Sequence, residues 1–245
     1  ISIMKKIFVI LICLITIPSF SFPIPKDKEV SFDIIRKNKT IGSVVTTFNE
    51  EEDKLIIRTI VDINVKILFI PAYKFFQDTT EVWFNGEFLK IDGYTDFEDE
   101  REYYIKGKDK NENFIASGMD GDLVLKSTIL PLNYWNKKIL EEEEVFDTQK
   151  GIVRKISVKK LDNETIEINN KEIVTEKYTL DATKNPKDLG PFPQYTLWYK
   201  NNETVSHMNT SCAKENLAAV YGSPTISLTG LYGAIWGTRY RLETE

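Results

Sequence analysis

The sequence predicts a mainly β protein in which a single antiparallel meander forms a curved sheet, a half-barrel or a barrel, with one or two short helices. The first observation is residues 55–66, where apolar and polar side chains alternate, as in a strand with one buried face. The second is Asn85-Gly86, because both central residues of a type I′ hairpin turn need positive φ. The third is that about a dozen such segments follow one another with short polar turns between them, which favours a meander over an α/β fold.

The N-terminal half justifies this prediction segment by segment. Alternating or β-branched stretches between turn residues predict strands over residues 30–34, 40–49, 55–66, 73–84, 88–97, 101–106, 114–116 and 123–127. Pro71 ends the apolar segment that follows the third of these strands. One face of the strand over residues 55–66 carries charged and amide side chains, so it is too polar for a parallel strand covered on both faces.

The C-terminal half contains further strands, at residues 152–159, 165–168, 173–180 and 195–199. Two stretches have a helical pattern, residues 132–144 and residues 211–221, the second of which is stopped by Gly222. Residues 206–237 are the least strand-like and form an atypical segment. The whole of residues 22–245 is nevertheless short enough to form a single β-rich domain.

The N-terminus predicts export. Met4 is the expected start, Lys5 and Lys6 supply a positive region, and residues 7–17 are an apolar run. Small residues then alternate up to Ser21, so residues 1–21 are expected to be a signal peptide cleaved after Ser21. The alternative, a membrane anchor, is disfavoured because the apolar run is shorter than the roughly 20 residues that span a bilayer. The expected location is therefore outside the cytoplasm, in the periplasm, with no integral membrane segment after cleavage.

Charge and cysteine content exclude other classes. The formal net charge is −5, and the charges of both signs are mixed, so nucleic acid is not an expected partner. Cys212 is the one cysteine that would remain after cleavage, so the fold is not expected to depend on an internal disulfide.

Motifs for catalysis, metals and cofactors are missing from the sequence. His207 is the single histidine, and the chain has no nucleophile elbow, zinc-protease helix or phosphate-binding loop. Asp120-Gly121-Asp122 resembles the start of a calcium loop, but its twelfth position is Pro131 rather than an acid, so a turn is expected. No catalytic residue, metal ligand or cofactor is therefore predicted. The acidic runs at residues 98–100 and 141–144 are expected to be solvated.

Six groups of residues resemble, in their order and spacing, a family of exported bacterial proteins known only as a domain of unknown function. The groups are Phe32-Asp33-Ile34 with Ile41-Gly42; Asp62-Ile63-Asn64-Val65-Lys66 with Pro71-Ala72-Tyr73; Thr80-Glu81-Val82-Trp83 with Gly86; Leu130-Pro131 with Tyr134-Trp135-Asn136; Asp147-Thr148-Gln149 with Gly151; and Leu197-Trp198-Tyr199. The pair YWN and DTQ-x-G is the most specific. The resemblance covers residues 29–200 and implies an antiparallel β fold in the periplasm without an assigned reaction.

Three functions remain open at this point. The first is a non-catalytic module that binds an apolar or lipid-like ligand in the concavity of a curved sheet. Its expected ligand contacts are Tyr134, Trp135, Asn136, Asp147, Gln149 and Trp83. The second is a structural or partner-binding envelope protein. The third, ranked last, is a hydrolase that uses Asp147 with Glu81 or Glu144.

The stretch from Leu130 to Gly151 also has a structural interpretation. Asn133 is expected to cap a short helix, and Trp135 to plug one end of the sheet. Asp147 and Thr148 are expected to bind their own turn, and Asp147-Thr148-Gln149 to fasten the strand that returns from it.

Overall fold

The computed structural model describes residues 24–25, 28–36, 39–67, 70–97, 101–110, 112–168, 171–187, 194–200, 203–211 and 225–227. The predicted signal peptide and Cys212 lie outside these residues, as does most of the predicted helix at residues 211–221. Among the described residues, no helix is long and apolar enough to cross a membrane.

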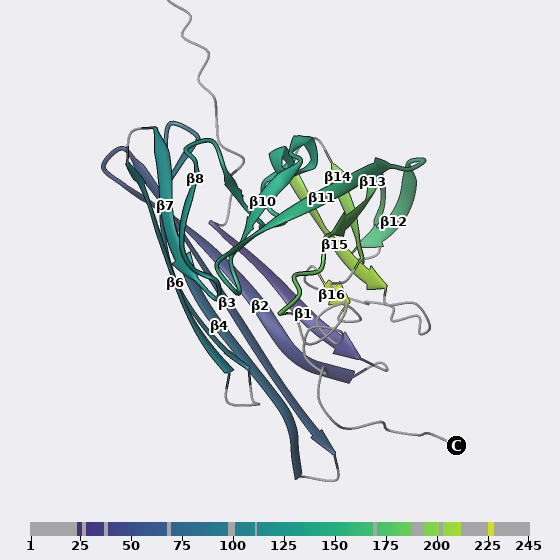
Figure 1. Cartoon of the computed structure of the whole chain (residues 1–245). Helices are drawn as coiled ribbons and strands as arrows, with labels where there is room; N and C mark the ends of the chain where they lie inside the picture. Colours follow the sequence, from purple (N-terminus) through teal and green to yellow (C-terminus); the bar gives the residue numbers. More distant parts are fainter. Residues whose placement is uncertain are drawn as a thin grey trace, which may run out of the picture.

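Eight consecutive strands form one long antiparallel meander, which curves along one side of the molecule (Figure 1). They are β1 (Glu29–Arg36), β2 (Lys39–Glu51), β3 (Lys54–Ile67), β4 (Ile70–Phe84), β5 (Glu87–Phe97), β6 (Arg101–Lys110), β7 (Asn113–Gly118) and β8 (Gly121–Lys126). Each strand pairs with its neighbours in sequence. The predicted meander is confirmed for this half of the chain.

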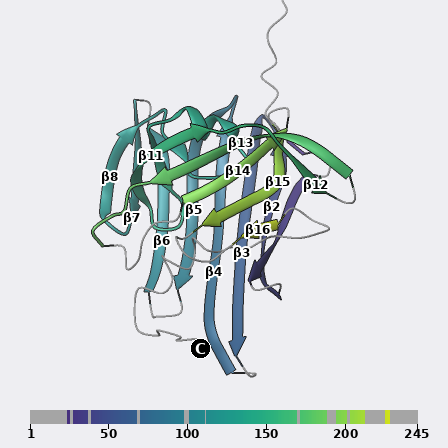
Figure 2. The same ribbon diagram turned by 90° about the vertical axis from the view of Figure 1, so that its right-hand side faces the viewer.

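The remaining strands form a second layer that crosses the concave face of the meander diagonally (Figure 2). They are β9 (Leu130–Pro131), β10 (Glu144–Asp147), β11 (Ile152–Lys160), β12 (Glu164–Ile168), β13 (Lys171–Ala182), β14 (Gln194–Lys200), β15 (Glu203–Ser211) and β16 (Thr225–Ser227). β16 lies parallel to both β1 and β15, and β9 lies parallel to β10. The second layer is therefore mixed, which a single antiparallel meander did not predict.

The local sequence explains why the strands form where they do. Along β3, Leu55, Ile57 and Ile63 are buried while Arg58 and Asp62 are exposed, as the alternation predicted. Between β4 and β5, Asn85 has φ 49° and Gly86 has φ 82°, which are the positive values of the predicted hairpin turn.

The space between the layers is filled by two groups of apolar side chains. One centres on Tyr73, Phe75 and Phe97 of the meander, packed against Leu197 and Tyr199 of β14. The other contains Phe48, Trp83, Phe88, Phe114, Trp135 and Phe146. On β4, which contributes to both groups, the inward positions between them are polar: Gln77, Thr79 and Glu81 are each less than 5% exposed. This polar row faces the segment that links the two layers.

The free end of the meander meets the second layer at two glycines. The backbone N–H of Met119 donates to the carbonyl of Lys150 at 2.7 Å. A Cβ on Gly118 would lie 2.4 Å from the carbonyl oxygen of Gly151, so only glycine permits this approach. The contact brings the β7–β8 hairpin onto the β10–β11 turn.

One prediction in the C-terminal half was wrong. Residues 132–144 do not form an α-helix; Lys137–Glu141 form one short 3₁₀ helix, η1, because Leu132, Asn133 and Trp135 extend into the interior and burial overrides local preference. Within segment 206–237, the described residues are the end of β15, which pairs with β14, and all of β16, which pairs with β1 and β15.

Candidate functional site

Trp83 and Trp135, two of the predicted ligand contacts, meet in the interior. Trp83 lies on β4 and is 1% exposed, and Trp135 comes from the segment between β9 and η1. Their ring centroids are 5.5 Å apart and nearly perpendicular. Trp135 also contacts Phe48 edge-on at 5.6 Å. The ring of Trp135 therefore joins the segment that links the two layers, which we call the crossing segment (residues 133–148), to the concave face of the meander. Edge-on contacts of this kind are favourable for aromatic pairs.

Glu81 lies beside this aromatic group. The indole N–H of Trp83 donates to Oε2 of Glu81 at 2.9 Å, and the amide of Asn133 donates to the same oxygen at 3.2 Å. Burial raises the pKa of Glu81 from 4.5 to about 7, although both hydrogen bonds favour the ionised form. Glu81 thus titrates near neutral pH inside the protein.

Gln77, in the polar row of β4, holds the other end of the segment that links the two layers. The amide of Gln77 donates to the hydroxyl of Thr79 at 3.0 Å and to the carbonyl of Thr148 at 3.4 Å. Together with the bond from Asn133 to Glu81, it ties both ends of residues 133–148 to one strand.

Asp147 forms a separate buried group at the β10–β11 turn. Its Oδ1 accepts hydrogen bonds from the backbone N–H groups of Gln149 and Lys150, at 2.8 and 3.3 Å. Its Oδ2 accepts from Nε of Arg154 at 2.7 Å, and both side chains are 3% exposed or less. The guanidinium also donates to the carbonyl of Thr183 at 3.0 Å. The predicted turn at Asp147 is confirmed, and Arg154 is the partner that sequence reasoning missed.

Tyr134 and Asn136 flank Trp135. The Tyr134 ring lies 4.9 Å from that of Tyr195, and its carbonyl accepts a hydrogen bond from the Tyr199 hydroxyl at 3.0 Å. Burial raises the pKa of all three tyrosines, so their phenols are neutral.

The helix cap is Asn136 rather than Asn133. Its side chain accepts from the backbone N–H of Lys138 at 3.1 Å. Asn133 instead accepts from the N–H of Asn136 at 3.3 Å while its amide binds Glu81, because burial turned its side chain inward.

We call Trp83, Tyr134, Trp135, Asn136, Asp147 and Gln149, together with Glu81, the closure cluster. Trp83, Trp135, Asn136 and Asp147 are buried, and Tyr134 and Gln149 are half-buried. A two-carboxylate hydrolase needs acids that a substrate can reach, whereas Asp147 is bound to Arg154 and Glu81 is enclosed. The described residues contain no group of three or more acidic, histidine or cysteine side chains that could hold a metal. The role of the closure cluster as ligand contacts stays a prediction.

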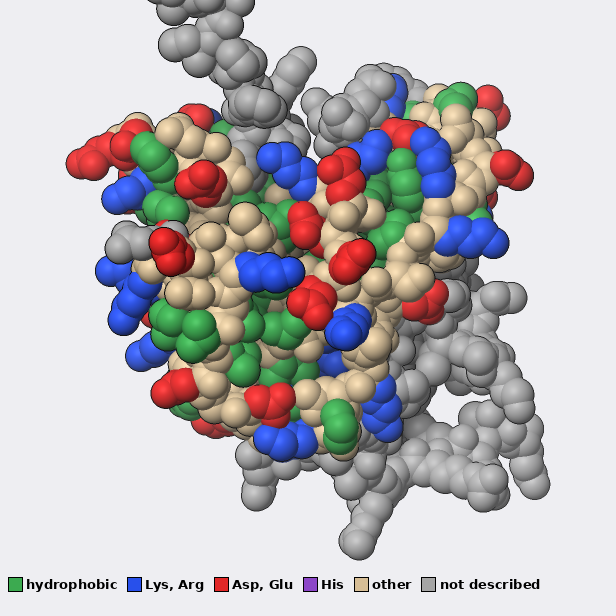
Figure 3. All heavy atoms as spheres, turned by 45° about the horizontal axis from the view of Figure 1, so that its top comes forward, with side chains coloured by type: hydrophobic (Ala, Val, Ile, Leu, Met, Phe, Trp, Pro, Cys, Tyr) green, Lys and Arg blue, Asp and Glu red, His purple; other side chains and the backbone are tan. Residues whose placement is uncertain are grey.

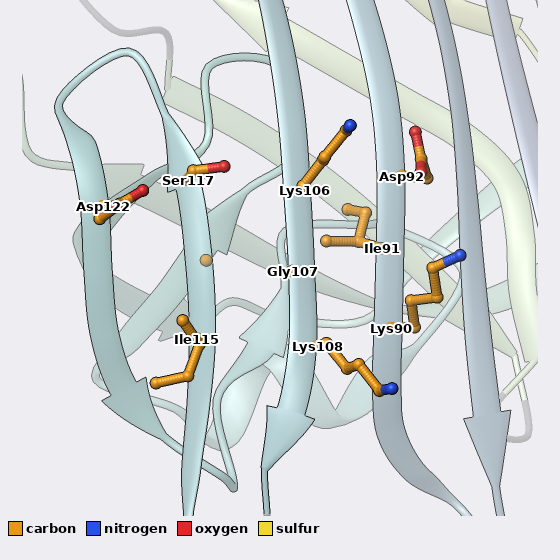
Figure 4. Close-up of a pocket in the computed structure, with 10 residues that line it drawn as sticks. Lys90, Ile91, Asp92, Lys106, Gly107, Lys108, Ile115, Ser117 and Asp122 are labelled. Carbon is orange, nitrogen blue, oxygen red and sulfur yellow. The ribbon is translucent and has the colours of Figure 1, made fainter.

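A hollow lies on the outer face of the meander, over β5 to β8 (Figure 4). Its volume is about 260 Å³. The floor is the backbone of Ile91, Gly107 and Ala116, which are paired across neighbouring strands and whose side-chain positions face the interior. One wall is the row Lys90, Lys108 and Ile115, which Val124 of β8 continues beyond the hollow; the other is the row Asp92, Lys106, Ser117 and Asp122. We call this hollow with its two walls the outer trough.

The walls of the outer trough differ in charge and polarity. Lys90 and Lys108 lie directly opposite each other on adjacent strands, and Val124 at the far end of the same wall is 71% exposed. Figure 4 shows Lys106 between Ser117 and Asp92 on the other wall. Within the part of the chain that the structure describes, Lys90, Lys106 and Lys108 have no ion-pair partner within 4.0 Å.

Sequence reasoning missed the outer trough. Alternation along residues 88–97 and 101–106 already indicated which side chains share a face. It could not show that Lys90 faces Lys108, since that depends on the register between strands.

Comparisons with known proteins agree with this fold. The chain is similar to a crystal structure of a β-barrel-like protein of the domain of unknown function DUF1849 from Brucella abortus. The TM-score is 0.52 at 13% sequence identity, over 75% of this chain and 89% of that one. A search of curated proteins finds no match. Residues 32–213 match the family described as domain of unknown function DUF6134. The chain therefore belongs to the DUF6134 family.

Proposed function

We propose that the protein is an exported, non-catalytic binding module for an apolar or lipid-like ligand. The observation that carries this proposal is the outer trough, where the aliphatic side chains of Ile115 and Val124 adjoin lysine, aspartate and serine side chains. A ligand site needs both kinds of surface, apolar groups that cover the ligand and polar groups that orient it.

The interior supports a binding role in preference to a catalytic one. Among the described residues, the deeply buried acids Glu81 and Asp147 are held by Asn133 and Arg154 and are shielded from a substrate. The closure cluster is a second place to look for a ligand, since a molecule entering the interior would contact Trp83 and Trp135.

The test begins with protein purified from its own cell envelope. Native mass spectrometry should detect a co-purifying lipid-like molecule, and the stripped protein should take up an apolar naphthylamine dye. A protein that carries no such molecule and takes up no dye would overturn the proposed function.

A pair of matched variants locates the binding site. Val124 in the outer trough is 71% exposed and Val174 on β13 is 64% exposed. Val124→Ser should weaken dye binding and Val174→Ser should leave it unchanged, because only the first removes apolar surface from the trough. Equal effects of the two variants would exclude the trough as the site.

Export rests on the N-terminal segment and is tested separately. The positive residues Lys5 and Lys6 followed by the apolar run support a cleaved signal peptide. In the native host, the periplasmic fraction should contain a mature protein whose first residue is Phe22. A full-length protein that stays with the membrane would contradict cleavage.

A further inference from the structure

We propose that the ligand of the outer trough is an anionic amphiphile, with its anionic group at Lys90 and Lys108 and its apolar part along Ile115 and Val124. This inference rests on the proposed function and adds the chemical class of the ligand and its orientation. It follows from strand register, charge and exposure.

One wall of the trough is itself amphiphilic. Register places Lys90 opposite Lys108, Lys108 opposite Ile115, and Ile115 opposite Val124. The wall therefore changes from cationic on β5 and β6 to aliphatic on β7 and β8. Since neighbouring strands are about 4.8 Å apart, the wall extends roughly 14 Å across the sheet. An amphiphile lying across the strands would match it end to end.

At the cationic end two like charges stand opposite each other, while Asp92, two residues further along β5, stands opposite Lys106. Like charges directly opposite each other on paired strands destabilise a sheet, and no described carboxylate forms an ion pair with Lys90 or Lys108. An anionic group at this end would relieve the repulsion and accept hydrogen bonds from both ammonium groups.

The second wall orients the ligand in the same direction. Lys106 stands opposite Asp92 on one side and Ser117 on the other, so it faces a carboxylate and a hydroxyl where Lys90 and Lys108 face each other. Asp122 lies at the β8 end, opposite Ser117. Its carboxylate disfavours an anion at that end, whereas Val124 offers apolar surface there. The anionic group is thus favoured near β5 and β6.

The size and overall charge of the protein favour a single amphiphile over a charged surface. The hollow of about 260 Å³ is slightly smaller than common pockets for small molecules, so it suits a head group and the first part of a chain. The net charge is −5, and acidic and basic side chains are interspersed over the face seen in Figure 3. An anionic membrane would be repelled by the protein as a whole, while a small anion responds to lysines within a Debye length of about 8–10 Å.

The test compares two probes that differ only in their head group, measured by calorimetry on the mature chain. Myristoyl lysophosphatidylglycerol, which is anionic, should bind roughly fivefold to tenfold more tightly than myristoyl lysophosphatidylcholine. Its advantage should shrink at high salt. The double variant Lys90→Gln/Lys108→Gln should abolish the difference. The control Lys155→Gln/Lys159→Gln, which removes the same charge from exposed positions of β11, should preserve it.

Other results would overturn the inference in distinguishable ways. Equal affinity for the two lysolipids would remove the anionic preference and leave the proposed function standing. Loss of the difference in the Lys155/Lys159 control would indicate a general charge effect. Inorganic phosphate binding as tightly as the lysolipid would make the site an anion site only, and binding to phosphatidylglycerol vesicles alone would indicate a membrane surface. Failure to bind either lysolipid, with no dye uptake, would remove the proposed function itself.

Discussion

Glu81→Gln is expected to change how the stability of the protein depends on pH. Burial raises the pKa of Glu81 from 4.5 to about 7. The folded protein therefore holds this proton more strongly than the unfolded chain, and the stabilisation is complete below about pH 4.5 and lost as pH rises through 7. The difference between the two pKa values corresponds to about 3 kcal/mol of unfolding free energy.

Glu81→Gln should remove the loss of stability at high pH while keeping the hydrogen bonds around residue 81. Trp83 and Asn133 both donate to Oε2 of Glu81, and the carbonyl oxygen of a glutamine can accept both bonds. Glu81→Gln should be as stable as the parent protein at pH 4.5 and more stable by about 3 kcal/mol at pH 8 or above.

Urea unfolding followed by tryptophan fluorescence, repeated from pH 4.5 to pH 9, measures the difference between the two proteins. Contributions from other carboxyl groups cancel in that difference. Glu87→Gln, on the exposed side of the β4–β5 hairpin, is the control and should follow the parent protein at every pH. A difference between Glu81→Gln and the parent protein that does not vary with pH would refute the reasoning.

Three further changes test how the layers are closed. Trp135→Ala should lower the free energy of unfolding by about 3–5 kcal/mol, because it leaves a cavity beside Phe48 and Trp83. Unchanged stability in a urea titration would contradict the interpretation of Trp135 as a plug. Arg154→Met should cost about 3–5 kcal/mol by leaving Asp147 buried without its partner, and adding Asp147→Asn should recover part of it, as a double-mutant cycle would show. Gly118→Ala should lower the melting temperature, since its Cβ would collide with the backbone of Gly151; a normal melting temperature would mean that the glycine contact is dispensable.

Short-range sequence signals determined much of the meander. The buried face of β3 and the Asn85-Gly86 turn were readable because side-chain alternation and positive φ are local properties. The turn at Asp147 was readable for the same reason, since its carboxylate binds N–H groups two and three residues ahead.

The tertiary structure alone decided what these elements do together. Gln77 and Glu81 look like ordinary polar residues of a strand, and they became buried only because the crossing segment with Trp135 covers them. β16 forms because distant strands β1 and β15 supply its hydrogen bonds. Lys90 and Lys108 became neighbours through the register of β5 and β6. Burial and strand pairing depend on contacts between residues far apart in the chain, and no local pattern encodes them.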